Sequence, residues 1–203
     1  MLRLNHISHA YGNETVLHDI SLNIDKGAFT IITGESGSGK STLLSVMSTL
    51  LKPTEGELFF EKRNARDITG IDRFRNQKIG FIFQFHYLIS HLSVYENIAI
   101  ATTHSEKTIE LLLGKLGIED LRNKYPDQIS GGQRQRAAIA RAMINRPDYI
   151  FADEPTGNLD SKNAQIVFDL LRGLDACVIV ATHDHSRIRP GDRVISLKDG
   201  QLC

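Results

Sequence analysis

The stretch Gly34-Glu35-Ser36-Gly37-Ser38-Gly39-Lys40-Ser41 decides the fold of this chain. It fits the pattern Gly-x-x-x-x-Gly-Lys-Ser/Thr; a β-branched run over 29–33 leads into it, and a segment with helical spacing leaves it at 41–47. A strand, a glycine-rich loop and a helix in this order form the context in which the pattern binds phosphate. The glycines let backbone N–H groups turn toward an anion, and the helix N-terminus adds partial positive charge. The stretch therefore predicts a nucleoside triphosphate site.

The side chains of this loop have individual expected roles. Lys40 is expected to reach the β- and γ-phosphates of the nucleotide, and the Ser41 hydroxyl is expected to ligate Mg²⁺. The other loop residues expected to contact the nucleotide are Gly34, Glu35, Ser36, Gly37, Ser38, Gly39 and Thr42. A flexible Gly/Ser turn is the alternative interpretation, and a lysine and a serine in register behind a strand argue against it.

Length and composition are those of an ordinary globular chain. The 203 residues suffice for one domain with a full core, and 41% of them are apolar. Lys plus Arg (24) balances Asp plus Glu (24), so the charge predicts no nucleic-acid partner. No stretch approaches the roughly 18 apolar residues of a membrane span. Two isolated cysteines, Cys177 and Cys203, indicate a reducing compartment, so a cytoplasmic location is expected.

The hydrophobic pattern predicts an α/β fold. Strands are expected at 2–7, 16–24, 29–33, 58–60, 78–83, 149–152, 177–181 and 193–197. Helical spacing is found at 94–101, 106–116, 133–144 and 161–174, within a stretch that turns helical from about residue 85. Apolar strands that alternate with helices indicate a parallel sheet covered on both faces. We expect a single domain, 1–203, with a nucleotide-binding core of 1–84 and 147–203 and a helical subdomain inserted at about 85–146.

Two carboxylates end one of the apolar strands. Asp153 and Glu154 follow the run over 149–152. Because ligands bind at the carboxyl ends of parallel strands, this pair is expected beside the phosphate loop. Asp153 can hold Mg²⁺, usually through water, and Glu154 can orient and deprotonate the attacking water as general base. The alternative is a solvated acid pair at a strand end.

A second helix start also has the composition of an anion site. Ser130-Gly131-Gly132-Gln133 opens the most regular predicted helix, with Ser130 as N-cap and Gln133 as its capping-box partner. A cap alone does not require two glycines, whereas glycines at a helix start let the backbone approach an anion closely. A γ-phosphate bound by both helix starts requires the second to come from elsewhere on this chain or from another copy.

The order of these motifs resembles that of ABC-type ATPases. The phosphate loop, Gln84 after a strand, the run 129–133, the Asp153-Glu154 strand, the run Asn158-Leu159-Asp160 and His183 follow one another as in that family. Tyr11 stands where the family keeps an aromatic residue that stacks on adenine. The resemblance implies a P-loop NTPase core with a parallel sheet, an N-terminal antiparallel β subdomain and an inserted α-helical subdomain.

The resemblance also implies an assembly and further roles. ATP would lie in a head-to-tail homodimer, between the phosphate loop of one subunit and the Ser130 to Gln133 segment of the other. Gln84 would act as Mg²⁺ ligand and sensor, Asp160 as a contact across the dimer, and His183 as a γ-phosphate clamp. Each has a plainer interpretation: Tyr11 as a turn aromatic, Gln84 as a strand-end residue, and His183 as one of eight histidines.

Two longer runs narrow the resemblance. The segments 75–88 and 152–163, with Glu96-Asn97, are similar to the ATPases of lipoprotein-releasing (LolD-type) and macrolide-exporter (MacB-type) systems. This similarity implies a cytoplasmic ATPase at the inner face of the cell membrane, bound to an integral membrane permease supplied by another chain. Phe85, His86, Tyr87 and Leu88 are expected in a groove that receives a helix of that partner. Ile129 stands where the signature motif of the family usually has a leucine. The stretch 101–106 is short for the group.

Other classes of protein fit the sequence less well. A soluble ABC-type ATPase that acts on DNA or ribosomes usually carries coiled-coil insertions or two cassettes, which this sequence lacks. A regulatory module without turnover would not need Glu154 and His183. A kinase or GTPase would share the phosphate loop but leave Ser130 to Gln133 unexplained. We therefore expect the ATPase subunit of a membrane transporter.

Overall fold

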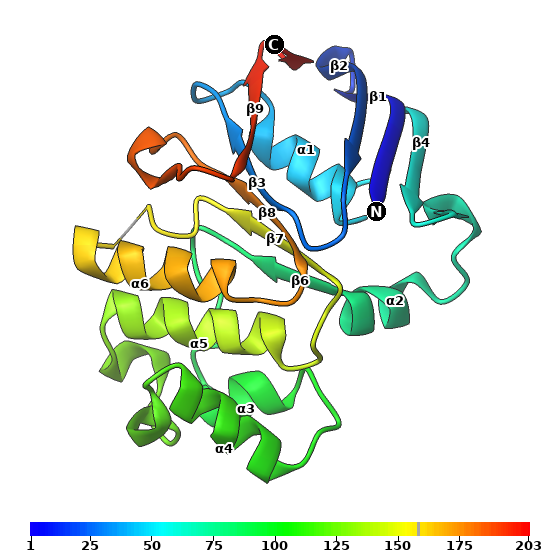
Figure 1. Cartoon of the computed structure of the whole chain (residues 1–203). Helices are drawn as coiled ribbons and strands as arrows, with labels where there is room; N and C mark the ends of the chain where they lie inside the picture. Colours follow the sequence, from blue (N-terminus) through cyan, green and yellow to red (C-terminus); the bar gives the residue numbers. More distant parts are fainter. Residues whose placement is uncertain (158) are drawn as a thin grey trace.

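The strands of the computed structural model, which describes residues 1–157 and 159–203, form two sheets (Figure 1). The first sheet has four strands in the order β2-β1-β4-β5. Neighbouring strands in it are antiparallel, and the bounds are β1 Leu2–Tyr11, β2 Glu14–Ile24, β4 Glu55–Phe60 and β5 Arg63–Asn64. One face of this sheet is buried, as the alternation of apolar and polar residues in β1 and β2 predicts.

The second sheet positions the functional residues. Its order is β10-β9-β3-β8-β7-β6, and all neighbours are parallel except the short pair β9–β10. The bounds are β3 Phe29–Thr33, β6 Ile79–Ile82, β7 Tyr149–Asp153, β8 Cys177–Ala181, β9 Arg193–Lys198 and β10 Gln201–Leu202. Because β3, β6, β7 and β8 run in the same direction, their carboxyl ends meet at one edge of the sheet.

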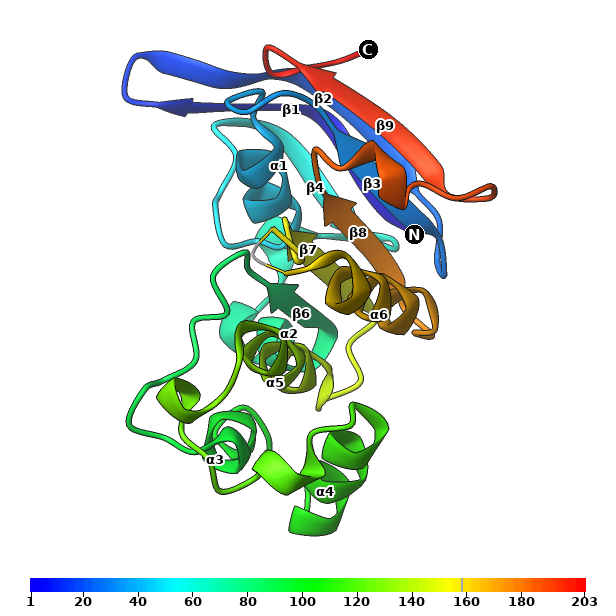
Figure 2. The ribbon, with the colours of Figure 1, turned by 90° about the vertical axis from the view of Figure 1, so that its left-hand side faces the viewer.

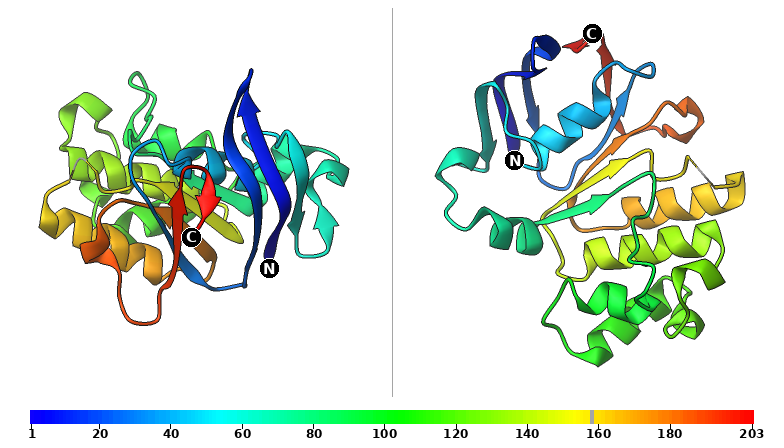
Figure 3. Two further views of the ribbon diagram at one scale, coloured as in Figure 1. Left: turned by 90° about the horizontal axis from the view of Figure 1, so that it is seen from above. Right: turned by 180° about the vertical axis from the view of Figure 1, so that it is seen from behind.

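Helices cover both faces of the parallel sheet. In Figure 1, α1 lies on one face, and α5 and α6 lie on the other. The antiparallel sheet and the helices α3 and α4 stand at opposite ends of the molecule (Figures 2 and 3). The bounds are α1 Lys40–Met47, α2 Ile71–Lys78, α3 Val94–Ala99, α4 Glu106–Lys115, α5 Gly131–Met143 and α6 Ser161–Arg172. None of the helices in the described part of the chain is both long and apolar enough to span a bilayer.

The buried side chains form two hydrophobic clusters, one on each face of the parallel sheet. The first cluster joins the antiparallel sheet, α1 and one face of the parallel sheet. The second joins the other face to α3, α4, α5 and α6. Successive residues of β7 alternate between them: Phe151 lies in the first cluster, and Ile150 and Ala152 lie in the second. Side chains of a strand point alternately to opposite faces, so β7 and β8 each contribute to both clusters.

The predicted fold class is confirmed, and the differences are local. The prediction misses α2, whose eight residues include six polar or charged ones, so that Lys78 belongs to a helix and the strand begins at Ile79. Helical structure from residue 85 is wrong for 85–93, since the next helix begins at Val94. There the Asn97 side chain bonds the N–H and the C=O of Ile89, at 2.7 and 3.0 Å. A side chain from a later helix therefore fixes this segment.

Candidate nucleotide-binding site

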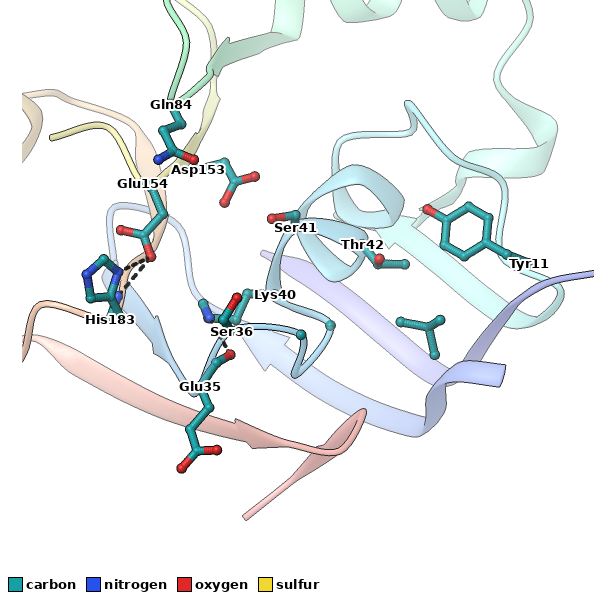
Figure 4. Close-up of a pocket in the computed structure, with 13 residues that line it drawn as sticks. Tyr11, Glu35, Ser36, Lys40, Ser41, Thr42, Gln84, Asp153, Glu154 and His183 are labelled. Atoms are coloured by element: carbon teal, nitrogen blue, oxygen red, sulfur yellow. Dashed lines mark hydrogen bonds and ion pairs between the residues drawn. The ribbon is translucent and has the colours of Figure 1, made fainter. Parts of the chain in front are cut away.

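A cavity of about 680 Å³ opens at the carboxyl edge of the parallel sheet (Figure 4). Its volume falls within the range of small-molecule sites, roughly 300–1,000 Å³. The residues that line it are Tyr11, Val16, Glu35, Ser36, Gly37, Gly39, Lys40, Ser41, Thr42, Gln84, Asp153, Glu154 and His183. These residues come from β1, β2, the loop after β3, α1, the end of β7, and the segments that follow β6, β7 and β8. The cavity therefore brings together most of the residues predicted to bind ATP.

The loop between β3 and α1 has the shape that its glycines allow. Gly39 is the N-cap of α1 with φ of 99°, and a Cβ atom there would lie 3.0 Å from Leu17 Cδ2. At Gly34, with φ of 155°, a Cβ atom would lie 2.2 Å from the carbonyl oxygen of Leu197. Side chains at either position would strain the loop or push it away from β2 and β9. The glycines thus let the backbone fold closely at the start of the helix.

The side chain of Lys40 forms hydrogen bonds with the backbone of this loop. Its side chain is buried, with the residue 8% exposed, and Nζ donates hydrogen bonds to the carbonyl oxygens of Gly34 and Glu35, both at 2.8 Å. An ammonium group has three donor hydrogens, so a third remains for another acceptor. In Figure 4 the Glu35 side chain points away from the carboxylates of Asp153 and Glu154.

Asp153, the last residue of β7, faces Ser41 and Gln84 across the cavity (Figure 4). Burial raises the pKa of its carboxyl above the ordinary value. The Glu154 charge reinforces this shift, whereas the Ser41 hydroxyl and the Lys40 ammonium oppose it. Its Oδ1 is buried and has no hydrogen-bond partner among the described residues. A buried carboxylate oxygen without a partner is unfavourable unless a cation or a donor completes it.

Glu154 turns out of the strand with φ of 43°, a left-handed conformation that is uncommon for a residue with a side chain. Its carboxylate accepts from the Thr182 hydroxyl at 3.0 Å and from the His183 backbone N–H at 3.0 Å. The ring Nδ1 of His183 lies 2.8 Å from the same oxygen, Oε1. The carboxylate is mostly buried, and the His183 ring is 72% exposed. The two predicted residues are thus a contacting pair.

Gln84 and Tyr11 lie at different sides of the cavity (Figure 4). Gln84 follows β6, and its side-chain nitrogen would lie 3.1 Å from a Cβ atom at Gly157. Tyr11 ends β1, is 52% exposed, and meets the ring of His9 edge to face at 4.8 Å. An exposed ring that is braced from one side can accept a second flat ring on its free face.

Several predicted residues are not brought to this cavity. Of the described residues, Gly34 and Ser38 lie on the far side of the loop, in a hollow shared with Leu197 and Lys198. Ser130 to Gln133 and Asp160 line neither hollow. Asn158 of the predicted run lies outside the described residues.

The predicted residues that lie outside the cavity include the caps of two helices. Ser130 and Gln133 form the predicted capping box of α5, with the Ser130 N–H donating to Gln133 Oε1 at 2.8 Å. Asp160 caps α6, and hydrogen bonds from Asn163 hold the pKa of its carboxyl below the ordinary value. Ser130 and Asp160 are both exposed in this subunit.

The sequence prediction overlooked two residues at the site. Val16 lines the cavity beside Tyr11. Thr182, which is fully buried, donates to Glu154 from the segment after β8. Its position just before His183 is the one signal available in the sequence, and it does not reveal the hydrogen bond to a residue 28 positions earlier.

The chain matches the ABC transporter family over residues 17–157. It is 44% identical over 199 residues to the lipoprotein-releasing system ATP-binding protein LolD of Buchnera aphidicola, covering 92% of this chain and 87% of that protein. Among solved structures it is similar to the dimeric bacterial ABC transporter cassette MJ0796, with a TM-score of 0.91, 39% identity, and 100% and 96% of the two chains covered.

A second solved state of that cassette is a post-hydrolysis dimer bound to ADP and phosphate. It matches with a TM-score of 0.90 and 38% identity, over 100% of this chain and 96% of that one. The cavity, the glycine-rich loop and these similarities agree with one another. The chain belongs to the ABC transporter family, as one of its ATP-binding subunits.

Proposed function

We propose that this ABC-type ATPase hydrolyses ATP between two copies of the chain and so drives an integral membrane permease of the lipoprotein-release or MacB-like export type. The proposal rests on one observation: some of the predicted motifs line the cavity and others do not. The phosphate loop, Gln84, Asp153, Glu154 and His183 share one cavity, whereas the described residues of the Ser130 to Gln133 segment and Asp160 lie outside it. A second copy can supply what this cavity lacks.

Nucleotide binding is assigned to the loop and to Tyr11. The backbone of the loop from Glu35 to Gly39 and the start of α1 would surround the phosphates, with Ser36 and Thr42 adding donors. Lys40 would place its third N–H on the β- and γ-phosphates. The exposed face of Tyr11 would stack on adenine.

The donor set beside the loop fits Mg²⁺. Asp153 Oδ1 has no hydrogen-bond partner in the described part of the chain. This oxygen, the Ser41 hydroxyl and the Gln84 side chain are oxygen ligands of the kind that Mg²⁺ prefers, and in Figure 4 the three side chains lie around one space. We assign the metal to these residues. When bound there, Mg²⁺ neutralises charge that develops on the phosphates.

Glu154 is proposed as the general base, and His183 as its partner at the γ-phosphate. The contacts from Thr182 and His183 fix the direction of the Glu154 carboxylate, and its position at the cavity wall leaves it next to the phosphate loop. A carboxylate so held can orient a water molecule and take its proton in the transition state. The His183 ring, which is largely exposed, can turn toward a terminal phosphate.

The second half of the site is assigned to another copy of the chain in head-to-tail arrangement. The dimeric state of the solved cassette with a TM-score of 0.91 supports this assignment. In this dimer Ser130, Gly131, Gly132 and Gln133 would face the γ-phosphate bound by the other subunit. Asp160 would contact the other subunit across the interface.

A membrane partner would place the chain at the cytoplasmic, inner face of the cell membrane. The similarity to a protein named for a lipoprotein-releasing system supports this location. After Gln84, Phe85 and Tyr87 are 59% and 62% exposed, which leaves an aromatic surface for a partner helix. Leu88 instead packs against the helical cluster. Another cavity, of about 690 Å³, lies between α2 and the segments that follow α3 and α5, but none of the described residues 85–88 lines it.

The alternative, a soluble ABC-type ATPase that acts on DNA or ribosomes, is supported less well. Lys plus Arg (24) equals Asp plus Glu (24), so the chain has no basic excess of the kind that favours nucleic-acid binding. The relatives named for lipoprotein release point to transport.

One experiment tests the proposal. Glu154→Gln keeps the shape of the side chain but cannot take a proton, so ATP turnover should fall by roughly 10²–10⁴. Since bound ATP then persists and contacts both copies, size-exclusion chromatography should show a dimer with ATP and Mg²⁺ and a monomer without them. A variant that keeps normal turnover, or that stays monomeric with ATP, contradicts the proposal.

A further inference from the structure

The direction of the Glu154 carboxylate depends on the segment that follows β8. The N–H of Glu154 donates to Ala181 O at 2.9 Å, and its side chain is bonded by Thr182 through Oε2 and by His183 through Oε1. The left-handed φ of 43° needs such support, because the conformation is unfavourable for glutamate. The segment 181–183 therefore sets where the carboxylate points.

The Thr182 hydroxyl has a fixed hydrogen-bonding role. The residue is fully buried, and its own N–H donates to Ile32 O at 3.0 Å, on the strand that leads into the phosphate loop. Its oxygen accepts the N–H of Asp184 at 3.1 Å. A hydroxyl carries one hydrogen, so this hydrogen is left for Glu154 Oε2 at 3.0 Å. Thr182 thus orients one carboxylate oxygen from within the core.

Arg187 fastens the same segment to α6. Its Nε donates to Asp184 Oδ2 at 2.9 Å, and its Nη atoms lie 3.4 Å from Gln165 Oε1 and 3.5 Å from Ser161 Oγ. The guanidinium side chain is 13% exposed. A continuous set of contacts therefore runs from the first turn of α6 through Arg187, Asp184 and Thr182 to Glu154.

We propose that Thr182 is a positioning residue for Glu154 and that Arg187, through Asp184, keeps Thr182 in place against α6. The inference rests on the proposed role of Glu154 as general base. Neither Thr182 nor Arg187 is among the described residues that line the nucleotide cavity. Their effect must pass through the carboxylate, because a base that rotates freely is seldom aligned with the attacking water.

Matched substitutions isolate the hydroxyl. Thr182→Val keeps the volume and the branched Cβ but removes the donor, so turnover should fall about 10- to 100-fold, the effect of one hydrogen bond to a charged group. The KM for ATP should not change, since Thr182 is not among the described residues that line the nucleotide cavity. Thr182→Ser keeps the hydroxyl and should stay within about threefold of the parent, because its donor remains.

The arginine is tested in the same way. Arg187→Met should lower turnover about 3- to 10-fold, because it releases only the support of Thr182. Arg189→Met is the matched control: Arg189 pairs with Asp169 on the same helix α6 at 2.7 Å, but in the described part of the chain it makes no hydrogen bond or ion pair with Asp184 or Thr182, so turnover should be unchanged.

The decisive measurement is a double-mutant cycle of ATP turnover, with thermal unfolding of each variant as the folding control. If Thr182 acts through Glu154, Thr182→Val should change the residual rate of Glu154→Gln by less than about twofold. An equal loss in both backgrounds, or a Thr182→Val protein as active as the parent, overturns the inference. Thr182→Ala serves in the cycle if the valine variant does not fold. A fully active Glu154→Gln protein would instead refute the base assignment.

Discussion

Asn163, in the first turn of α6, lies against Gly132, in the first turn of α5: a Cβ atom at position 132 would stand 3.1 Å from Asn163 Cγ. The same asparagine donates from its N–H and from Nδ2 to the two carboxylate oxygens of Asp160, at 2.9 and 2.7 Å. The two segments proposed to face a second subunit are therefore packed against each other within one subunit.

This contact predicts that Gly132→Ala weakens the ATP-dependent dimer. The added methyl group must displace Asn163 by a few tenths of an ångström, and Asp160 with it. Dimer formation by the Glu154→Gln protein with ATP should then require several-fold more protein, as measured by size-exclusion chromatography over a dilution series. Gly132→Ala combined with Asn163→Ala makes room for the methyl group and should recover part of the loss. A glycine variant that dimerises normally would show that this packing is unimportant.

Ser130→Arg should abolish the same dimer. A long cationic side chain at the start of α5 would occupy the approach of the γ-phosphate, while the Lys40 loop of the same subunit remains intact. In the Glu154→Gln background the double variant should therefore bind ATP and elute as a monomer. Equilibrium binding of ATP is the control, and a dimer that persists would remove Ser130 from the interface.

Lys40→Ala should abolish measurable ATP binding. The substitution removes the charge meant for the β- and γ-phosphates and also frees the carbonyl groups of Gly34 and Glu35. Binding of ATP to the purified protein, followed by calorimetry, measures the loss. Lys40→Arg keeps the charge and should retain more affinity than alanine; equal losses would assign the effect to loop geometry rather than to charge.

Tyr11→Ala should weaken ATP binding by about 1–3 kcal/mol, the usual contribution of stacking between a base and an aromatic ring. Turnover at saturating ATP should change little, because Tyr11 lies away from Glu154 and His183 (Figure 4). Tyr11→Phe keeps the ring and should bind normally. Unchanged affinity in the alanine variant would mean that the exposed ring does not meet the base.

Arg172→Ala should destabilise the fold. Its guanidinium bonds Asp192 at 2.7 Å, with side chains 16% and 6% exposed, and lies over the ring of Phe29 at 4.6 Å. Removing one member of such a buried pair leaves the other charge without compensation and costs about 3–5 kcal/mol. Urea unfolding measures the change. Arg189→Ala, from an exposed pair with Asp169, should cost under about 1 kcal/mol.

Much of the fold was accessible from the sequence, because its signals are local. Strand alternation identified the sheets, and the phosphate loop identified the edge where ligands gather. The segment 85–93 was not accessible, because distant groups fix it: Arg141 on α5 donates to the carbonyl oxygens of His86 and Tyr87, at 3.0 and 2.8 Å. Helix α2 likewise lacks a clear periodic pattern of apolar residues, because Ile71 and Phe74 are its only apolar residues.

The candidate site likewise has features that the sequence reveals and features that it does not. The phosphate loop, Gln84, the Asp153-Glu154 pair and His183 were recognised from the sequence and line one cavity, since motif spacing reflects the chemistry of phosphate binding, whereas Ser130 to Gln133 and Asp160 lie outside it. The hydrogen bond from Thr182 to Glu154 joins two segments whose proximity depends on the pairing of β7 with β8. The assignment of individual roles, and the division into core and helical subdomain, remain predictions.

The alternation of side chains in β7 and β8 has a consequence for how the molecule melts. Tyr149 and Cys177 belong to one hydrophobic cluster, and their neighbours Ile150 and Val178 belong to the other. If either cluster unfolded, β7 and β8 would lose the packing on one of their faces, and the other cluster depends on the same two strands. Heating should therefore give a single cooperative transition, and a fragment limited to the helices, cut from these strands, should not fold by itself.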